Sequence, residues 1–326
     1  MIKSKPLFKA LFVSIISVGL WNSCTPIENP QDVVNQIQKP LEAVKNNLVK
    51  PEPLNRLKEL KIDYSMPSQV FLCGQRLPLE RPAVYERLEK EFILAVNHRA
   101  QVELWRRRAL RYFPLIEKAL MQAGLPEDLK YLAVAESDLR PTVSSPAGAT
   151  GIWQFIPGTA RRFGLKVDKF QDQRMLPEPL LNIGLQYLTS LRHRFGDWSL
   201  AMAAYNAGEA RIAKTMSQQG LSDYWSLSLP TETERYVYRI AAIKLVLEGA
   251  PLYGFNDRPE PGLYQPPAFK EKTMLFKEPT AWTELAVQVG TDYKSLRRLN
   301  PHLASQSPLK GGPYIIRLPA KTKTSS

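Results

Sequence analysis

A glutamate stands on the apolar face of a helix that the sequence predicts over residues 126–140. Leu129 and Leu132 set the buried face, and Glu136 belongs to it because it lies four residues after Leu132. Desolvation there, together with the negative end of the helix dipole, would raise the pKa of the Glu136 carboxyl. A general acid that works near neutral pH needs such a group. A surface glutamate at a frayed helix end fits the same spacing.

Aromatic and amide side chains follow at two places in the same region. A loop of small residues, 144–151, leads to the first group, and a second apolar helix ends at the other. Amides can donate and accept hydrogen bonds, as sugar hydroxyl and acetamido groups require. Each residue alone fits a structural role, but together with Glu136 they favour a carbohydrate site. The set is Trp153, Gln154, Phe155, Tyr205, Asn206 and Tyr236.

Mainly helical elements must position these residues. Residues 82–120 show helical periodicity, with Leu88, Phe92 and Val96 at four-residue spacing. The arginines at 106–108 and 111 are interpreted as a solvated face. Residues 125–254 alternate helical runs with glycine and proline breaks, which predicts a compact helical domain. After a proline-rich stretch, two short helices and a closing strand predict a small α+β module near the C-terminus.

The first residues have the layout of a secretory signal. Lys3 and Lys5 precede an apolar run over 7–21, which is short for a membrane span, and Cys24 follows directly. This arrangement resembles a bacterial lipobox, in which the cysteine is lipidated. An uncleaved N-terminal anchor is the alternative. We therefore expect an exported, periplasmic, lipid-anchored protein. Because Thr25 rather than aspartate follows Cys24, the outer membrane is favoured over the inner.

Charge and cysteine content narrow the partners. The formal net charge of +13 favours anionic partners, and an exported, wall-facing protein makes nucleic acid an unexpected one. With Cys24 lipidated, Cys73 stands alone, so neither a disulfide framework nor a zinc cluster is expected. Cys73 lies in an apolar stretch and is interpreted as a small buried hydrophobic residue. The sequence implies no cofactor, no metal and no particular protein partner.

Three short motifs resemble the signatures of family 1 lytic transglycosylases, which share the goose-type lysozyme fold. They are Ala135-Glu136-Ser137, Gly-Ile-Trp-Gln-Phe-Ile-Pro at 151–157, and Ala-Tyr-Asn-Ala-Gly at 204–208. Glu232-Thr233 and Tyr236-Val237 resemble a fourth signature. Order and spacing also match, and the resemblance covers residues 110–255. It implies a mainly α, α+β lysozyme-like catalytic domain that acts on peptidoglycan glycan strands.

The resemblance also implies a reaction. Glu136 would protonate the glycosidic oxygen between N-acetylmuramic acid and N-acetylglucosamine. Its carboxylate would then deprotonate the muramoyl 6-hydroxyl, which closes a 1,6-anhydro ring without consuming water. Glycosidases usually need two carboxylates, and the sequence offers no convincing second one. Asp138 is two helix positions from Glu136 and is expected to point elsewhere.

Roles for other residues follow from the same resemblance. Ser137 and Gln154 would orient Glu136 or the acetamido group, and Tyr236 would hydrogen-bond near Glu136. Tyr205 and Asn206 would bind the sugar, with Phe155 beside them in the substrate site. Two alternatives stay open: a goose-type hydrolase with a positioned water, and a non-catalytic wall-binding lipoprotein.

The C-terminal module resembles LysM, a βααβ fold that binds N-acetylglucosamine. It departs from that pattern at 276–282, so an accessory domain that binds no sugar is nearly as well supported. The branch of the family that couples the catalytic domain to LysM modules fits this order. The expected organisation is a signal peptide at 1–23, a proline-rich tether at 24–65, a helical extension at 66–109, the catalytic domain at 110–255, a linker at 256–268 and the LysM-like module at 269–320.

Overall fold

The computed structural model describes residues 62–255, 264–304 and 308–320. The part up to residue 255 is mainly helical and is built around one hydrophobic core. Its α-helices are α2 (Pro82–Asn97), α3 (Arg99–Gln122), α4 (Lys130–Ser137), α5 (Pro157–Arg162), α6 (Pro177–Phe195), α7 (Trp198–Ala207), α8 (Glu209–Gln219) and α9 (Thr231–Glu248). Short 3₁₀ turns lie at η2 (Glu127–Leu129), η3 (Gln173–Met175) and η4 (Tyr224–Ser226).

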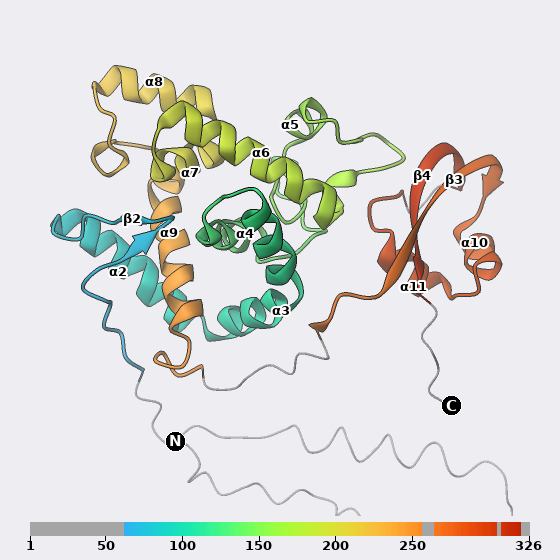
Figure 1. The fold of residues 1–326 in the computed structure, drawn as a ribbon, viewed down its shortest axis with the longest axis horizontal. Coiled ribbons are helices and arrows are strands. Elements are labelled where there is room, and N and C mark those ends of the chain that lie inside the picture. Colours follow the sequence, from blue (N-terminus) through green and yellow to red (C-terminus); the bar gives the residue numbers. More distant parts are fainter. Residues whose placement is uncertain (1–61, 256–263, 305–307, 321–326) are drawn as a thin grey trace, which may run out of the picture. The chain divides into compact units, whose positions relative to one another are not determined.

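The short helix α4 lies inside the ring of longer helices (Figure 1) and packs against α9 and α3. All of its residues from Lys130 to Ala135 are buried. The predicted helix over 126–140 therefore has different bounds. It begins with the 3₁₀ turn η2 and ends at Ser137, because Asp138 and Leu139 adopt left-handed backbone angles. The helix therefore ends before it reaches Pro141, so this proline is not what ends it.

The helices predicted over 82–120 are present as α2 and α3, with Leu88, Phe92 and Val96 fully buried as expected. The buried face of α3 is formed by Val102, Trp105, Ile116 and Leu120, whereas Leu104 is exposed.

The arginines of α3 are half-buried and make specific hydrogen bonds, rather than forming a solvated face. Arg107 pairs with Glu103, and Arg108 donates to the carbonyl oxygen of Asp138 at 3.0 Å. Arg108 therefore holds the left-handed turn that ends α4.

A two-stranded hairpin, β1 (Phe71–Leu72) and β2 (Gln75–Arg76), precedes α2 and was not predicted. The apolar stretch around Cys73 forms its turn, with Cys73 at a φ of 53°. Cys73 is buried, as expected, and burial raises the pKa of its thiol. Its backbone N–H donates to Asp128, which also pairs with Lys244, so the turn is fixed by polar contacts that the sequence pattern does not reveal.

The C-terminal part has the predicted βααβ order and its own small core. Strand β3 (Phe269–Thr280) pairs antiparallel with β4 (Leu309–Pro319), and α10 (Trp282–Gln288) and α11 (Tyr293–Leu299) lie between them in sequence. Trp282, Leu285, Leu296 and Ile316 belong to this core.

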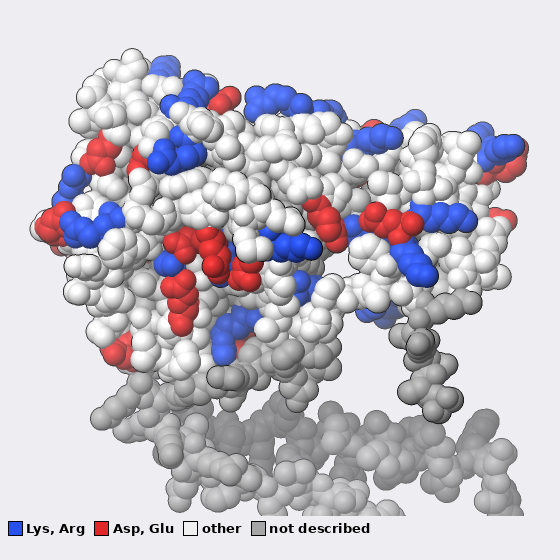
Figure 2. Space-filling view, in the orientation of Figure 1, with Lys and Arg blue, Asp and Glu red and all other residues white. Residues whose placement is uncertain are grey.

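The expected signal peptide, Cys24 and almost all of the proline-rich tether fall outside the described residues, as does most of the expected linker at 256–268. Within the described ranges, no helix is long and apolar enough to cross a membrane. On the face drawn in Figure 2, basic side chains are spread over the surface, and a group of acidic side chains lies among them.

Candidate active site

A cavity of about 1240 Å³ lies beside the end of α4. Glu136 lines it, together with Gln154, Phe155, Tyr205, Asn206 and Tyr236. These residues come from α4, from the loop before α5, from α7 and from α9, so the fold brings the separate motifs to one place. Two predicted site residues, Ser137 and Trp153, do not line the cavity. The side chains of both are buried.

The surroundings of Glu136 favour its protonated form. Burial is the largest cause and raises the pKa of the Glu136 carboxyl from 4.5 to about 7. The hydrogen bond from Tyr236 and the charge of Arg239 act in the opposite direction, and the charge of Glu232 adds to the rise. Glu136 can therefore hold a proton near neutral pH and release it with little cost, as a general acid and base must.

Tyr236 donates its hydroxyl hydrogen to Oε1 of Glu136. Tyr236 is buried on α9, and the two residues meet because α4 and α9 pack side by side. Burial, with the nearby Glu136 carboxylate, raises the pKa of Tyr236 well above its usual value. Tyr236 therefore remains a donor over the whole range in which Glu136 titrates.

Ser137, Gln154 and Tyr205 all hold the backbone of the loop at 143–156. The Ser137 hydroxyl donates to the carbonyl oxygen of Ile152 at 2.8 Å, and the Tyr205 hydroxyl donates to that of Trp153 at 2.6 Å. The Gln154 amide nitrogen donates to the carbonyl oxygens of Gly151 at 2.8 Å and Val143 at 3.1 Å. No contact of Ser137 or Gln154 with the Glu136 carboxyl is seen among the described residues.

Phe155 and Asn206 also contact other residues of the cavity wall. The Phe155 ring meets that of Tyr205 edge-on, with centroids 5.9 Å apart. The Asn206 side-chain oxygen accepts a hydrogen bond of 2.9 Å from the buried Thr233 hydroxyl. The amide nitrogen of Asn206 is then the group that can donate into the cavity.

Three further carboxylates line the cavity, and the expectation that Asp138 points elsewhere is wrong. Because Asp138 has left-handed backbone angles and no longer follows the helix, its side chain reaches the cavity wall. It accepts a hydrogen bond of 2.8 Å from Trp105 Nε1. Glu91 is buried and pairs with Arg235 at 2.6 Å, while Glu232 is exposed at the start of α9.

One wall of the cavity comes from the helical extension, which sequence reasoning did not include in the site. The residues are Glu91, Leu94, Ala95, His98, Gln101 and Trp105 of α2, α3 and their junction. Apart from the adjacent Leu94 and Ala95, they recur every three or four positions, the spacing of one helix face. The sequence signal that could have revealed this wall is the presence of a polar residue at three of these positions. No group of three or more His, Cys, Asp or Glu side chains in the described ranges is arranged to hold a metal ion.

Comparisons with known proteins show what the part of the chain around Glu136 is similar to. Residues 113–228 match the family described as "Transglycosylase SLT domain". This range includes Glu136 and the loop and helix that carry Gln154, Phe155, Tyr205 and Asn206, but it excludes the wall from α2 and Tyr236 on α9.

Particular relatives share more of the chain. Membrane-bound lytic murein transglycosylase D of Escherichia coli K12 is 31% identical over 223 residues, which are 66% of this chain and 47% of that protein. The chain thus spans about half the length of this relative. Soluble lytic murein transglycosylase of the same organism is 31% identical over 163 residues, 46% of this chain and 25% of that protein. The crystal structure of the 70-kDa soluble lytic transglycosylase from Escherichia coli is 26% identical, covers 54% of this chain and 31% of its own, and has a TM-score of 0.39.

Proposed function

We propose that the protein is a peptidoglycan lytic transglycosylase that cleaves the bond between N-acetylmuramic acid and N-acetylglucosamine without consuming water. The observation that carries this proposal is the Glu136 carboxyl in the cavity, whose pKa is raised to about 7 and which Tyr236 contacts. The match of the surrounding residues to the transglycosylase SLT domain, and the curated relatives, support the same reaction.

Glu136 acts first as an acid and then as a base. Its proton passes to the glycosidic oxygen, and the bond from that oxygen to the anomeric carbon of the muramoyl sugar breaks. The Glu136 carboxylate then takes the proton of the muramoyl 6-hydroxyl, whose oxygen attacks the anomeric carbon and forms the 1,6-anhydro ring. Tyr236, which remains a hydrogen-bond donor, stabilises the intermediate carboxylate, and Arg239 lowers the cost of that charge.

The remaining site residues position the glycan. The Asn206 amide nitrogen donates to the sugar, and Phe155 supplies an apolar face. Ser137, Gln154 and Tyr205 act on the substrate through the loop whose carbonyl groups they hold. This differs from the direct sugar or Glu136 contacts that the family resemblance implies for them.

A hydrolase is the second candidate, because the cavity contains other carboxylates. Glu91 is engaged by Arg235, and Asp138 accepts from Trp105 and Arg140, so neither is free to activate water. Glu232 is the remaining candidate, and its charge raises the pKa of Glu136, which places it within electrostatic reach. If Glu232 served as the second acid, its change to Gln would abolish turnover. Transglycosylation predicts only a modest effect.

The test is incubation of the protein and its Glu136→Gln variant with purified peptidoglycan, followed by mass spectrometry of the soluble products. Muropeptides with 1,6-anhydromuramic acid ends, absent with the variant, are expected. Products heavier by one water would establish hydrolysis instead. Binding without products would indicate a wall-binding protein and would contradict the proposal.

We also propose that the protein is exported and held at a membrane by lipid on Cys24, and that the C-terminal module binds glycan. The signal-like N-terminal segment supports the first idea, and the βααβ order supports the second. Cys24→Ala should move the protein from the membrane fraction to the soluble periplasmic fraction. Unchanged fractionation would contradict lipid anchoring.

A further inference from the structure

The loop at 143–156 forms much of the cavity wall, although little of it is regular secondary structure. Ser145, Ala147, Ala149, Gln154 and Phe155 all line the cavity. Gln154 has a left-handed φ of 47°, which costs free energy for a non-glycine residue. A loop in this conformation keeps one shape only if its surroundings hold it.

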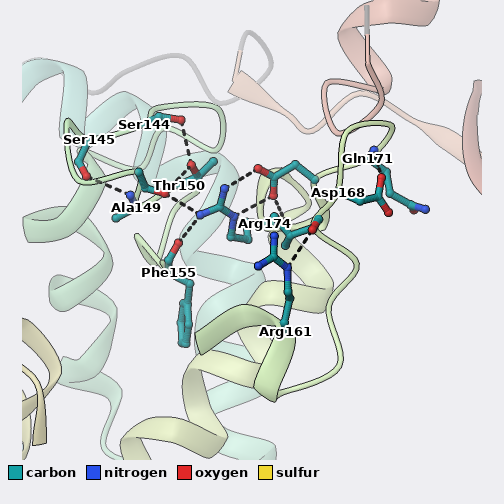
Figure 3. A network of polar contacts seen from close by, with 12 residues as sticks. Ser144, Ser145, Ala149, Thr150, Phe155, Arg161, Asp168, Gln171 and Arg174 are labelled. Carbon is teal, nitrogen blue, oxygen red and sulfur yellow. Dashed lines mark hydrogen bonds and ion pairs between the residues drawn. The ribbon is translucent and has the colours of Figure 1, made fainter. Parts of the chain in front are cut away.

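A buried arginine that belongs to none of the sequence motifs helps to keep the loop in this conformation. Arg174 lies in η3 and is 5% exposed. Its Nη1 donates to the carbonyl oxygens of Gly148 at 2.7 Å and Phe155 at 2.8 Å, so one nitrogen joins the middle of the loop to its C-terminal end (Figure 3). Two short contacts inside the loop, Ser144 with Thr150 and Ser145 with Ala149, lie next to this bridge in the same view.

Asp172 fixes the guanidinium from its other side. It accepts from Arg174 Nε at 2.9 Å and from Nη2 at 2.6 Å, the two-point geometry that holds an arginine plane in one orientation. Asp172 also accepts from the backbone N–H of Arg174, which caps the 3₁₀ turn. The guanidinium is thus oriented before it meets the loop.

The backbone of Arg174 supports the loop as well. A Cβ atom on Gly151 would lie 2.0 Å from the carbonyl oxygen of Arg174, so the two backbones are in close contact. Arg174 itself does not line the cavity. Any effect that it has on substrate must therefore pass through the loop.

We propose that Arg174 is a positioning residue for the proposed transglycosylase reaction: by joining the Gly148 and Phe155 carbonyl groups it fixes the wall that binds the glycan in the cavity that Glu136 also lines. This inference rests on the proposed function. Lysine cannot replace the arginine here, because its ammonium is a single point that cannot reach both carbonyl groups and both Asp172 oxygens in one plane. The requirement is therefore for the guanidinium shape as well as for its charge.

The experiment compares Arg174→Lys with Arg161→Met. Arg161 is a matched control, since it also donates to a backbone carbonyl, that of Val167 at 3.0 Å, but lies outside the loop and is exposed. Both variants are measured for kcat and KM on soluble glycan strands, and for hydrogen exchange of the amides at 145–155. A smaller folded fraction lowers kcat and leaves KM unchanged, so KM and exchange report on the loop itself.

For Arg174→Lys we expect a KM raised by about tenfold and faster exchange at 145–155, with exchange in α7 unchanged. Arg161→Met should match the wild type in both. If Arg174→Lys does not fold, Asp172→Asn gives the milder test, because it loosens the guanidinium and leaves its carbonyl bonds in place. Wild-type KM and exchange in the folded variant would overturn the proposal. If the wild type itself shows no turnover, the proposed function fails, whereas exchange at 145–155 still decides whether Arg174 holds the loop.

Discussion

Glu136 combines two requirements that usually conflict: it is buried enough to keep its proton, and it still faces a cavity. Burial supplies the rise in its pKa, and Tyr236 and Arg239 limit that rise. A carboxyl with its pKa near the working pH exchanges protons in both directions at the lowest cost. Chemistry with one acid/base group therefore has a physical basis here that does not depend on family resemblance.

The raised pKa of Glu136 predicts a stability cost that depends on pH. Between pH 4.5 and about 7 the unfolded chain loses this proton while the folded chain keeps it, so the wild type loses stability relative to Glu136→Gln as pH rises. The advantage of the variant should be near zero below pH 4.5 and level off above pH 7 at roughly 3 kcal/mol. Urea unfolding of both proteins at several pH values measures it. A difference that does not change with pH would contradict this account of Glu136.

Tyr236→Phe tests whether the hydrogen bond from Tyr236 lowers the pKa of Glu136 against the effect of burial. Removing the hydrogen bond, which lowers the pKa of Glu136, should raise that pKa further. Activity depends on the protonated acid, so the fall of kcat/KM at high pH should move to higher pH, while kcat at the optimum falls. Tyr224→Phe is the control, because Tyr224 is also buried and hydrogen-bonded but contacts backbone carbonyl groups away from the cavity. An unmoved pH profile for Tyr236→Phe would remove Tyr236 from the mechanism.

At the scale of elements, the sequence predicted which helices exist better than where they end. Leu129, Leu132 and Glu136 follow helical spacing, so the face that carries Glu136 could be read directly. The end of α4 could not be predicted from this spacing, because it depends on the left-handed backbone angles of Asp138 and Leu139. Trp105 and Arg108 on α3 stabilise Asp138 in this turn through hydrogen bonds. The same contacts explain why Asp138 faces the cavity.

Other parts of the site were missed for a similar reason. The wall formed by α2 and α3 carries no motif, and its six cavity residues are common types whose meaning depends on packing against α9. Arg174 is likewise an ordinary arginine in sequence. Its role follows only when its guanidinium meets the carbonyl groups of Gly148 and Phe155. Motifs predicted the groups that can do chemistry, but not the groups that hold them.

Gly151→Ala tests the close approach of the loop and η3. The new Cβ would be 2.0 Å from the backbone carbonyl oxygen of Arg174, at a φ of +90°. We expect the free energy of unfolding to fall by about 3 kcal/mol or more, since backbone on both sides must shift. Gly164→Ala is the matched control: its φ is +87° but no atom lies within 4 Å of the new Cβ. Equal losses for the two variants would show that backbone strain alone, and not contact with η3, explains the glycine.

At the scale of the whole molecule, the net charge of +13 should aid capture of the anionic cell wall. Salt screens such attraction, so binding to insoluble peptidoglycan should weaken as ionic strength rises from low to physiological values. Co-sedimentation with purified peptidoglycan measures this. Binding of neutral chito-oligosaccharides is the comparison and should change little. If wall binding did not depend on salt, recognition would rest on the glycan alone.

The order of the two described parts, a helical domain followed by a small α+β module, was predicted from proline-rich breaks and from periodicity, whereas the βααβ order of the module was implied by its resemblance to LysM. Each part has its own hydrophobic core. The separation of cores is what made the organisation readable, because each core imposes its own pattern on a continuous stretch of sequence. The hairpin β1–β2 was the exception, since its turn depends on Asp128 from the helical core.

The central claim, that Glu136 drives cleavage without water, is tested most directly by digestion of peptidoglycan in water labelled with heavy oxygen. Transglycosylation closes the ring with the sugar's own 6-hydroxyl, so the new muramoyl ends should be 1,6-anhydro and carry no label. Glu136→Gln should give no new ends at all. Labelled reducing ends from the wild type would mean that water attacks the anomeric carbon, and would contradict the proposed reaction.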